Sequence, residues 1–360
     1  MADSNLKYLR KELMPLVPYT PGEQPNLGEA VVKINTNENP YPPSPKILKK
    51  IDEILSKGLL RKYPHYNSLK LRSAIAKKYN LNPDQILVTN GSDEALRLLF
   101  QAVLGPGDKI IAPDPTYSLY PVLVEQLMCG VEFKNIPVKE DLYFDHDALG
   151  KEKGKLIAFA HPNAPTGLLE KKENLVQLIK NFDGIVLSDE AYIDFAPEGT
   201  SLINEIGNCP NLVISRTFSK SYSLAGLRVG FLIGEKNLIE QISKLKDSYN
   251  LGMLEQEIAL AAFEDEEYFQ KNISLLISER SRVKTALEAL GFQITDSHTN
   301  FLFCKPHSKF KPEWIYESLK EKNILVRYFS KGIPKDYVRI SVGSKSENDQ
   351  LIQELKNLLK

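Results

Sequence analysis

One lysine of this chain lies where a buried strand is expected to end. Residues 212–230 read LVISRTFSKSYSLAGLRVG, in which a short apolar run leads to Ser219 and Lys220 and is followed by Arg228. Lysine is rarely found inside proteins, so Lys220 taken alone would be interpreted as a solvated surface cation. A desolvated lysine amine can instead attack a carbonyl group. The residues around Lys220 therefore decide between a surface role and a chemical one.

Three other apolar runs also lead to residues that could bind a ligand. GIVL is followed by Asp189 and Tyr192, LIAFA by Asn163, and KIIA by Tyr117. Each has an ordinary explanation by itself, as a loop carboxylate, a loop amide or a half-buried ring. In an open parallel sheet, however, ligands bind just beyond the carboxyl ends of the strands. The joint placement of these residues with Lys220 predicts a binding site at that edge.

The residue types match the functional groups of one cofactor, pyridoxal phosphate. This cofactor has an aldehyde that reacts with an amine, a basic ring nitrogen and a phosphate. Lys220 supplies the amine, and Asp189 can keep the ring nitrogen protonated because a nearby carboxylate favours a cation. Tyr117 is suited to stack on the ring, and Tyr192 is suited to hydrogen-bond the ring hydroxyl.

A phosphate site is predicted where the segment GSDEALRLLF, residues 91–100, begins a helix. Ser92 or Asp93 could be an ordinary helix cap there. The free N–H groups and the dipole at the start of a helix also favour an anion, however. Ser219 and Arg228 would complete such a site.

Composition excludes several other classes of protein. The 360 residues include 46 basic and 46 acidic ones without a block of like charge, so we expect neither a nucleic-acid partner nor a membrane surface. The three cysteines are far apart and form no CxxC motif, and the five histidines form no HExxH motif, so we expect no disulfide framework and no metal site. With no signal-peptide-like or membrane-spanning apolar stretch, we expect a cytoplasmic protein.

The pattern of apolar runs predicts the elements that position the site. Between residues 46 and 250, helical segments alternate with the runs QILVTN, DKIIAPD, EFKNIPV, KLIAFAHP, GIVLSDEAY, NLVISRTFSK and RVGFLIG. This alternation predicts an α/β large domain of three layers, with a mainly parallel sheet between helices. Residues 251–360 predict a smaller α+β domain. Residues 1–45, rich in proline and asparagine, predict an arm that packs with the small domain and a partner subunit.

Together the motifs resemble those of pyridoxal-phosphate aminotransferases of fold type I. RTFSKSYSLAGLRVG, SDEAYIDF, PNAPTG, PDPTYSLY and NTNENPYPPSP carry the likeness, which runs from about residue 15 to the C-terminus. Within that group the chain resembles the histidinol-phosphate aminotransferases. The resemblance implies that Lys220 is the catalytic Schiff-base lysine, Asp189 the partner of the ring nitrogen, Tyr192 the contact of the ring hydroxyl and Tyr117 the stacking residue.

Further site residues are implied by the resemblance alone. The phosphate site would comprise the backbone of Ser92, Asp93 and Glu94 with the side chains of Ser219 and Arg228. Tyr63 in RKYPHY would enter the cofactor site of the other subunit, which implies a homodimer with shared sites.

The substrate-binding residues implied by the resemblance are Tyr19, Asn39, Arg327 and Arg339. A planar guanidinium binds a carboxylate or a phosphate through two parallel hydrogen bonds, so two arginines could receive the anionic end of either substrate. Without the resemblance, both arginines would be interpreted as solvent-facing strand residues.

The motif PNAPTG departs from the family pattern PNNPTG. The second asparagine of that pattern hydrogen-bonds the ring hydroxyl, and here Ala164 takes its place. Either Asn163 substitutes for it as a cofactor-binding residue, or Tyr192 carries the ring hydroxyl alone.

The resemblance implies an aminotransferase that interconverts L-histidinol phosphate plus 2-oxoglutarate and imidazole acetol phosphate plus L-glutamate, in histidine biosynthesis. Two alternatives keep the same cofactor and fold: an aminotransferase for aromatic amino acids and a threonine-phosphate decarboxylase. A third alternative is a non-catalytic, regulatory protein that binds pyridoxal phosphate. The set of Lys220, Asp189 and Arg228 argues against this third interpretation.

Overall fold

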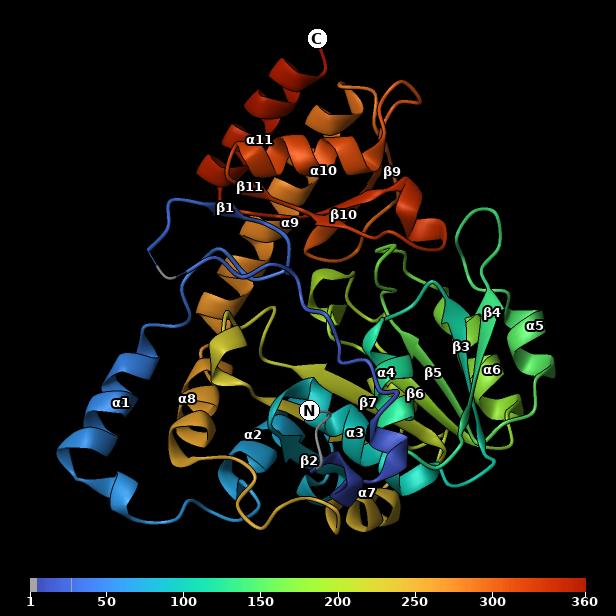
Figure 1. The fold of residues 1–360 in the computed structure, drawn as a ribbon. Coiled ribbons are helices and arrows are strands. Elements are labelled where there is room, and N and C mark those ends of the chain that lie inside the picture. Colours follow the sequence, from blue (N-terminus) through green and yellow to red (C-terminus); the bar gives the residue numbers. More distant parts are fainter. Residues whose placement is uncertain (1–4, 27) are drawn as a thin grey trace.

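The computed structural model describes residues 5–26 and 28–360, and it contains two main sheets (Figure 1). The larger sheet has seven strands in the order β2-β8-β7-β6-β5-β3-β4. Their bounds are β2 (Ile86–Thr89), β3 (Lys109–Asp114), β4 (Glu132–Pro137), β5 (Leu156–Ala160), β6 (Ile185–Asp189), β7 (Leu212–Thr217) and β8 (Gly230–Ile233). Strand β8 is antiparallel to both its neighbours, and the remaining pairs are parallel. The predicted α/β fold with a mainly parallel sheet is confirmed.

Helices cover both faces of this sheet because successive residues of a strand point to opposite sides. In β5, Leu156 and Ala158 lie in one core and Ile157 and Phe159 in the other. The first core includes α3 (Gly91–Val103), α4 (Leu119–Gln126) and α7 (Lys236–Ser243). The second includes α1 (Lys46–Ser56), α2 (Leu69–Tyr79), α5 (His146–Lys151), α6 (Lys172–Asn181) and α8 (Met253–Phe263). Burial on both faces explains why inner strands such as β5 are continuous apolar runs, whereas β4 at the edge of the sheet is mixed and mostly unburied.

The smaller sheet lies above the carboxyl ends of the parallel strands, and the long helix α9 (Glu266–Glu288) runs from one part of the molecule to the other (Figure 1). Its antiparallel strands follow the order β12-β13-β10-β9. Their bounds are β9 (Gln293–Ile294), β10 (Phe301–Lys305), β12 (Arg327–Tyr328) and β13 (Val338–Ser341), and the helices beside them are α10 (Pro312–Glu321) and α11 (Lys345–Leu358).

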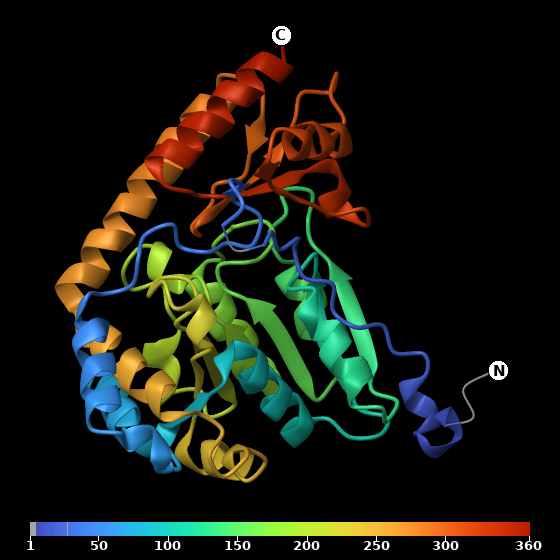
Figure 2. The same ribbon diagram turned by 60° about the vertical axis from the view of Figure 1, so that its left-hand side comes forward.

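The N-terminal arm runs along the boundary between the two parts (Figure 2). Its strand β1 (Val32–Lys33) pairs in parallel with β11 (Ile324–Leu325). The arm thereby brings the residues that follow β1 to the space between the two main sheets. The domain boundaries near residues 45 and 250 stay predictions.

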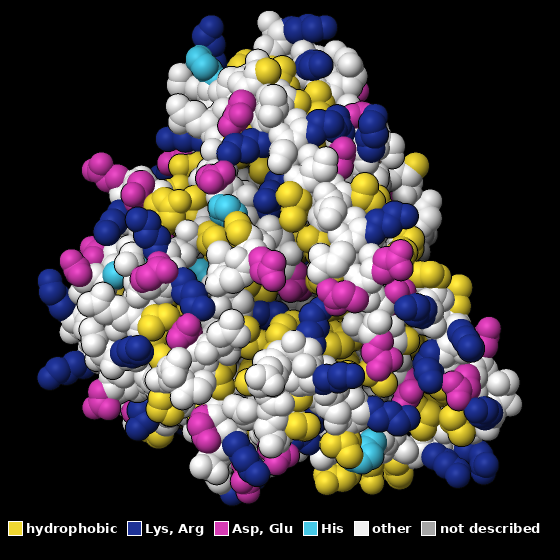
Figure 3. Space-filling model, turned by 180° about the vertical axis from the view of Figure 1, so that it is seen from behind, with side chains coloured by type: hydrophobic (Ala, Val, Ile, Leu, Met, Phe, Trp, Pro, Cys, Tyr) yellow, Lys and Arg dark blue, Asp and Glu magenta, His cyan; other side chains and the backbone are white. Residues whose placement is uncertain are grey.

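The surface carries both signs of charge. On the face opposite to that of Figure 1, basic and acidic side chains are interspersed, with small apolar areas between them (Figure 3). Among the residues that the structure describes, no helix is long and apolar enough to cross a membrane.

Candidate active site

A cavity of about 360 Å³ lies at the carboxyl ends of the parallel strands. It brings together predicted residues from the arm, the large sheet, its helices and the small sheet. These are Tyr19, Ser92, Asp93, Tyr117, Asp189, Tyr192, Ser219, Lys220, Arg228 and Arg339. Because they come from segments far apart in the sequence, their convergence is a property of the fold.

Lys220 follows β7, and its amine lies inside the cavity. Its Nζ donates a hydrogen bond to the backbone oxygen of Thr36 at 3.1 Å. Burial disfavours the charged form and lowers the pKa of Lys220 to about 8, and the positive charge of Arg339 acts in the same direction. A sizeable fraction of the amine is therefore neutral near pH 7 to 8, which is the form that attacks a carbonyl carbon.

Asp189, the last residue of β6, is only 3% exposed. Its Oδ1 accepts a hydrogen bond from Ser215 Oγ at 2.7 Å, and its Oδ2 accepts one from Tyr120 Oη at 3.1 Å. Burial raises its pKa to about 6, with a further contribution from the negative charge of Asp93. Asp189 forms no ion pair with any residue in the described part of the chain. A buried carboxylate of this kind is suited to a cationic group of a ligand, such as a protonated ring nitrogen.

The start of α3 forms a cradle that an anion would fit. Gly91 has φ +75°, and a Cβ added to it would lie 2.5 Å from Arg228 Nη2. A Cβ on Gly230 would lie 2.5 Å from the backbone nitrogen of Ser92. Arg228 itself donates to Ser219 Oγ at 3.2 Å and to Asp93 Oδ2 at 3.0 Å. Ser92, Asp93, Ser219 and Arg228 all line the cavity, so a phosphate bound there would meet the guanidinium at the start of the helix.

Glu94, predicted for the same phosphate site, does not line the cavity. Its carboxylate accepts the backbone N–H of Asn90 at 2.6 Å and Asn250 Nδ2 at 3.0 Å. The side chain therefore stabilises the first turn of α3, and at most its backbone could face the anion.

Tyr117 and Tyr192 line the cavity with their rings, and burial raises the pKa of both hydroxyls. The ring of Tyr117 meets that of Tyr120 edge to face, with centroids 5.6 Å apart. Tyr192 Oη accepts a hydrogen bond from Asn37 Nδ2 at 2.9 Å. Both hydroxyls stay protonated at neutral pH, so each can donate to an acceptor in the cavity.

Asn163 lies beside the cavity and does not line it. Its Nδ2 donates to the backbone oxygen of Pro115 and to Thr166 Oγ1, both at 3.1 Å. Ala164, in contrast, lines the cavity. Of the two alternatives for the ring hydroxyl, this arrangement favours Tyr192.

Arg339 lies on β13 opposite Arg327 of β12, at the boundary of the cavity with a second one of about 710 Å³. Arg339 Nη2 donates to the backbone oxygen of Asn35 at 3.1 Å, whereas its buried Nε has no hydrogen-bond partner among the described residues. Its guanidinium lies over the ring of Phe301, with Arg339 Cζ 5.2 Å from the ring centroid. An unpaired donor on a fixed guanidinium is suited to an anionic substrate group.

Arg327 and Asn39 have other surroundings. Arg327 lines only the second cavity, and it donates to the backbone oxygens of Thr20 and Pro21 over longer distances of 3.4 Å. Asn39 Nδ2 donates to the backbone oxygens of Lys220 and Ser221, at 3.1 and 3.3 Å. Asn39 therefore holds the loop that carries the lysine, and its amide is occupied in this way.

Tyr63 lies outside the cavity of its own chain. Its side chain is 79% exposed, and its ring stacks on that of Tyr249 with centroids 4.5 Å apart.

The sequence did not predict three residues of the site, which are Asn37, Tyr120 and Ser215. Tyr120 lies three residues after Tyr117, and Asn37 lies in the motif NTNENP, so each had a weak local signal. Ser215 faces Asp189 because these two residues pair in the register of β6 and β7.

Comparisons with known proteins identify the family of the chain. The family model for aminotransferase class I and II matches residues 29–355, and the chain belongs to that family. The resemblance recognised in the lysine motif is thereby confirmed.

Within this family, the chain is similar to several histidinol-phosphate aminotransferases. The chain is 39% identical over 357 residues to a histidinol-phosphate aminotransferase of Clostridium botulinum (strain Kyoto / Type A2), covering 98% of this chain and 99% of the relative. It is 41% identical over 359 residues to histidinol-phosphate aminotransferase 2 of Psychrobacter arcticus, covering 95% and 93%. The fold is similar to that of histidinol-phosphate aminotransferase from Sinorhizobium meliloti in complex with pyridoxal-5'-phosphate, with a TM-score of 0.84, 24% identity and coverage of 91% and 90%.

Proposed function

We propose that this chain is a pyridoxal-phosphate-dependent aminotransferase that interconverts L-histidinol phosphate plus 2-oxoglutarate and imidazole acetol phosphate plus L-glutamate, a reaction of histidine biosynthesis. Relatives named histidinol-phosphate aminotransferase match nearly the whole chain at 39 to 41% identity. The observation that carries the proposal is the convergence of the Lys220 amine, the buried Asp189 carboxylate and the Arg228 guanidinium in one cavity.

The residues of the cavity fit the three parts of the cofactor. Ser219, Arg228 and the first N–H groups of α3 would hold the phosphate, Asp189 the ring nitrogen and Tyr192 the ring hydroxyl. When bound, pyridoxal phosphate supplies an aldehyde for the lysine amine and a cationic ring that withdraws electrons from the substrate. The buried negative charge of Asp189 would stabilise the positive charge of the ring and so keep the ring nitrogen protonated.

Lys220 is the proton carrier of the site. Its lowered pKa of about 8 means that Nζ can hold or release a proton near neutral pH. With cofactor and substrate bound, Nζ of Lys220 would take the proton from the substrate carbon that bears the nitrogen. The same Nζ would return a proton to complete the transfer. Both substrates use this one site in turn, so ping-pong kinetics are expected.

Arg339 would bind the anionic end of each substrate, with Arg327 at the entrance. Histidinol phosphate presents a phosphate and glutamate presents a carboxylate, and a guanidinium fork can pair with either. The stacking of Arg339 on Phe301 fixes the fork before the substrate arrives. Tyr19 lines both cavities and would contact the substrate from the arm.

The working form we propose is a cytoplasmic homodimer. Tyr63 and Tyr249 form an exposed, stacked aromatic pair, which a second copy of the chain would cover. Tyr63 would then enter the cofactor site of the partner. The free state of Cys129, Cys209 and Cys304 suits a reducing compartment.

An amine-donor screen tests the proposed reaction. The purified holoprotein is mixed with histidinol phosphate, phenylalanine, tyrosine or threonine phosphate, and the visible absorbance of the cofactor is followed in single turnovers. Histidinol phosphate should convert the absorbance fastest by at least about tenfold. A preference for the aromatic amino acids, or release of CO₂ from threonine phosphate, would replace this proposal by one of the two related activities. No reaction with any amine would indicate a binding protein.

A labelling experiment tests the site independently of the substrate. Borohydride reduction followed by peptide mapping should place the cofactor on Lys220. Label on another lysine, or on none, would contradict the assignment.

A further inference from the structure

Asn37 lies where the arm, the small sheet and the cavity meet. It is only 1% exposed, and its φ of +57° is in the left-handed region that asparagine tolerates. Asn300 Nδ2 donates to its backbone oxygen at 2.9 Å, which holds this part of the arm in place. The conformation of Asn37 is therefore set by contacts far from it in the sequence.

The hydroxyl of Ser341 on β13 determines which way the amide of Asn37 points. Ser341 Oγ accepts the backbone N–H of Asn37 at 2.8 Å and donates its own hydrogen to Asn37 Oδ1 at 2.9 Å. Because Oδ1 faces Ser341, the NH₂ end of the amide faces Tyr192, and Nδ2 donates to Tyr192 Oη at 2.9 Å.

This hydrogen bond restricts the hydroxyl of Tyr192. A phenol has one hydrogen to donate, and its oxygen accepts hydrogen bonds from other groups. Since Asn37 already donates to the oxygen, the hydrogen of Tyr192 cannot point at Asn37. Tyr192 lines the cavity, so the hydrogen is left to an acceptor there.

We propose that Asn37 is a positioning residue, which directs the hydroxyl hydrogen of Tyr192 into the cavity and toward the ring oxygen of bound pyridoxal phosphate. This inference rests on the proposed function, because the acceptor belongs to the cofactor. Asn37 also joins Tyr192 to β13, the strand that carries Arg339. Tyr192, which would contact the cofactor ring, and Arg339, which would bind the substrate anion, are therefore both held by β13.

The substitution Asn37→Asp tests the direction of the hydrogen bond. Aspartate has the same shape and can still accept from Ser341, but its carboxylate cannot donate to Tyr192. The tyrosine hydroxyl would turn and donate to residue 37, so the ring oxygen would lose its donor. A donor stabilises that oxygen in its anionic form, and its loss makes the proton of the lysine-bound cofactor harder to remove.

The readout is the pH midpoint of the cofactor absorbance in the holoprotein without substrate. Asn37→Asp should raise this midpoint by about one to two pH units, because losing a hydrogen bond to a charged group shifts a pKa by about that amount. Tyr192→Phe removes the same donor and should shift the midpoint in the same direction. The new carboxylate also raises the midpoint through its charge. The same change is therefore made in a Tyr192→Phe background, where only the charge acts. The shift should be smaller there by about one unit.

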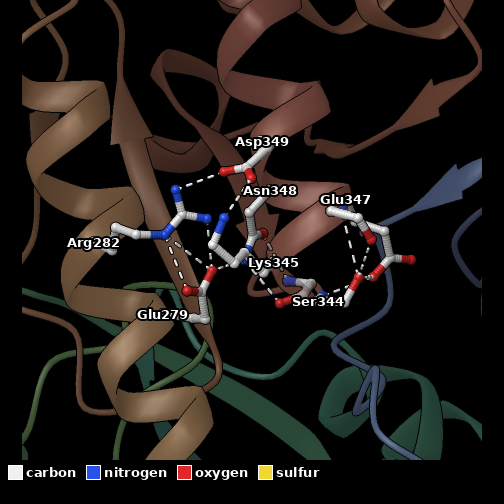
Figure 4. Close-up of polar contacts among 9 residues, drawn as sticks. Glu279, Arg282, Ser344, Lys345, Glu347, Asn348 and Asp349 are labelled. Carbon is white, nitrogen blue, oxygen red and sulfur yellow. Dashed lines mark hydrogen bonds and ion pairs between the residues drawn. The ribbon is translucent and has the colours of Figure 1, made fainter.

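A matched control is Asn348→Asp in α11. Asn348 is also buried, and its Nδ2 donates to Glu279 Oε2 at 2.9 Å and to the backbone oxygen of Gly343 at 2.8 Å (Figure 4). An aspartate there would face Glu279 and lower the melting temperature, and the absorbance midpoint should stay unchanged. A general loss of stability is thereby separated from an effect on Tyr192.

Equal shifts of the midpoint with and without the Tyr192→Phe substitution would overturn the inference, because Asn37 would then act only through charge or stability. If Asn37→Asp does not fold, Asn37→Ala answers the same question without a charge. It should raise the midpoint in the chain that keeps Tyr192 and leave the midpoint of the Tyr192→Phe chain unchanged, and equal effects would again overturn the inference. A wild-type protein that acquires no visible absorbance with pyridoxal phosphate would instead refute the proposed function itself.

Discussion

Asp189 should make the cofactor-free protein less stable as the pH rises from about 4 to about 6. The side chain is buried, and burial raises its pKa from 3.8 to about 6. Between these two values the folded protein keeps a proton that the unfolded chain has lost. The free energy of unfolding therefore falls as the pH rises through this window.

The shift in the pKa of Asp189 sets the size of the effect. A shift of about two units corresponds to roughly 3 kcal/mol, at about 1.4 kcal/mol per unit. Asn at this position does not titrate, so Asp189→Asn removes the slope. Altered hydrogen bonds to Ser215 and Tyr120 add an offset that is the same at every pH. Lys220, with a pKa of about 8, stays protonated throughout the window.

Urea unfolding of the apoprotein at several pH values between about 4 and about 7 measures this effect. The stability of Asp189→Asn relative to wild type should increase by roughly 3 kcal/mol across the window. Asp265→Asn is a control that should show no slope in this window. Hydrogen bonds from Lys46 and Ser44 lower the pKa of Asp265 below its ordinary value of 3.8, so its contribution is constant over this range and is lost only at lower pH. Parallel curves for wild type and Asp189→Asn would show that Asp189 has an ordinary pKa in the folded protein and would refute the reasoning.

Three further predictions concern the anion sites and the dimer. Arg339→Ala should lower kcat/KM for histidinol phosphate and for glutamate by roughly 30-fold to several thousand-fold, since truncating a buried charge pair costs about 2 to 5 kcal/mol; Arg339→Lys should restore little, and unchanged kinetics would remove this arginine from the substrate site. Mixed Lys220→Ala and Tyr63→Ala chains should recover part of the activity in hybrid dimers, and no recovery in verified heterodimers would contradict shared sites. Gly91→Ala should weaken pyridoxal phosphate binding to the apoprotein at least about tenfold, because its φ is +75° and the new Cβ would lie 2.5 Å from Arg228 Nη2; wild-type affinity in a titration would place the phosphate elsewhere.

The sequence by itself determined the strands of the large sheet and the chemistry of the candidate site. Each of the seven apolar runs forms a strand. In all of them except β4, which is mostly unburied at the edge of the sheet, burial on both faces leaves a nearly continuous apolar signal in a short segment. The motif RTFSKSYSLAGLRVG likewise carries Ser219, Lys220 and Arg228 within one short segment. Information of this kind is local, and a pattern of residue types is enough to recognise it.

Only the tertiary structure decided which of the candidate residues meet. Arg339 lines the cavity that contains Lys220, whereas Arg327 lines only the second, larger cavity. The two arginines nevertheless lie on neighbouring strands of the small sheet. Ser215 reaches Asp189 through the register of two parallel strands, and Asn37 reaches Tyr192 because the arm crosses between the two sheets. Such contacts depend on strand pairing, register and packing between segments far apart in the chain, and no local pattern of residues encodes these.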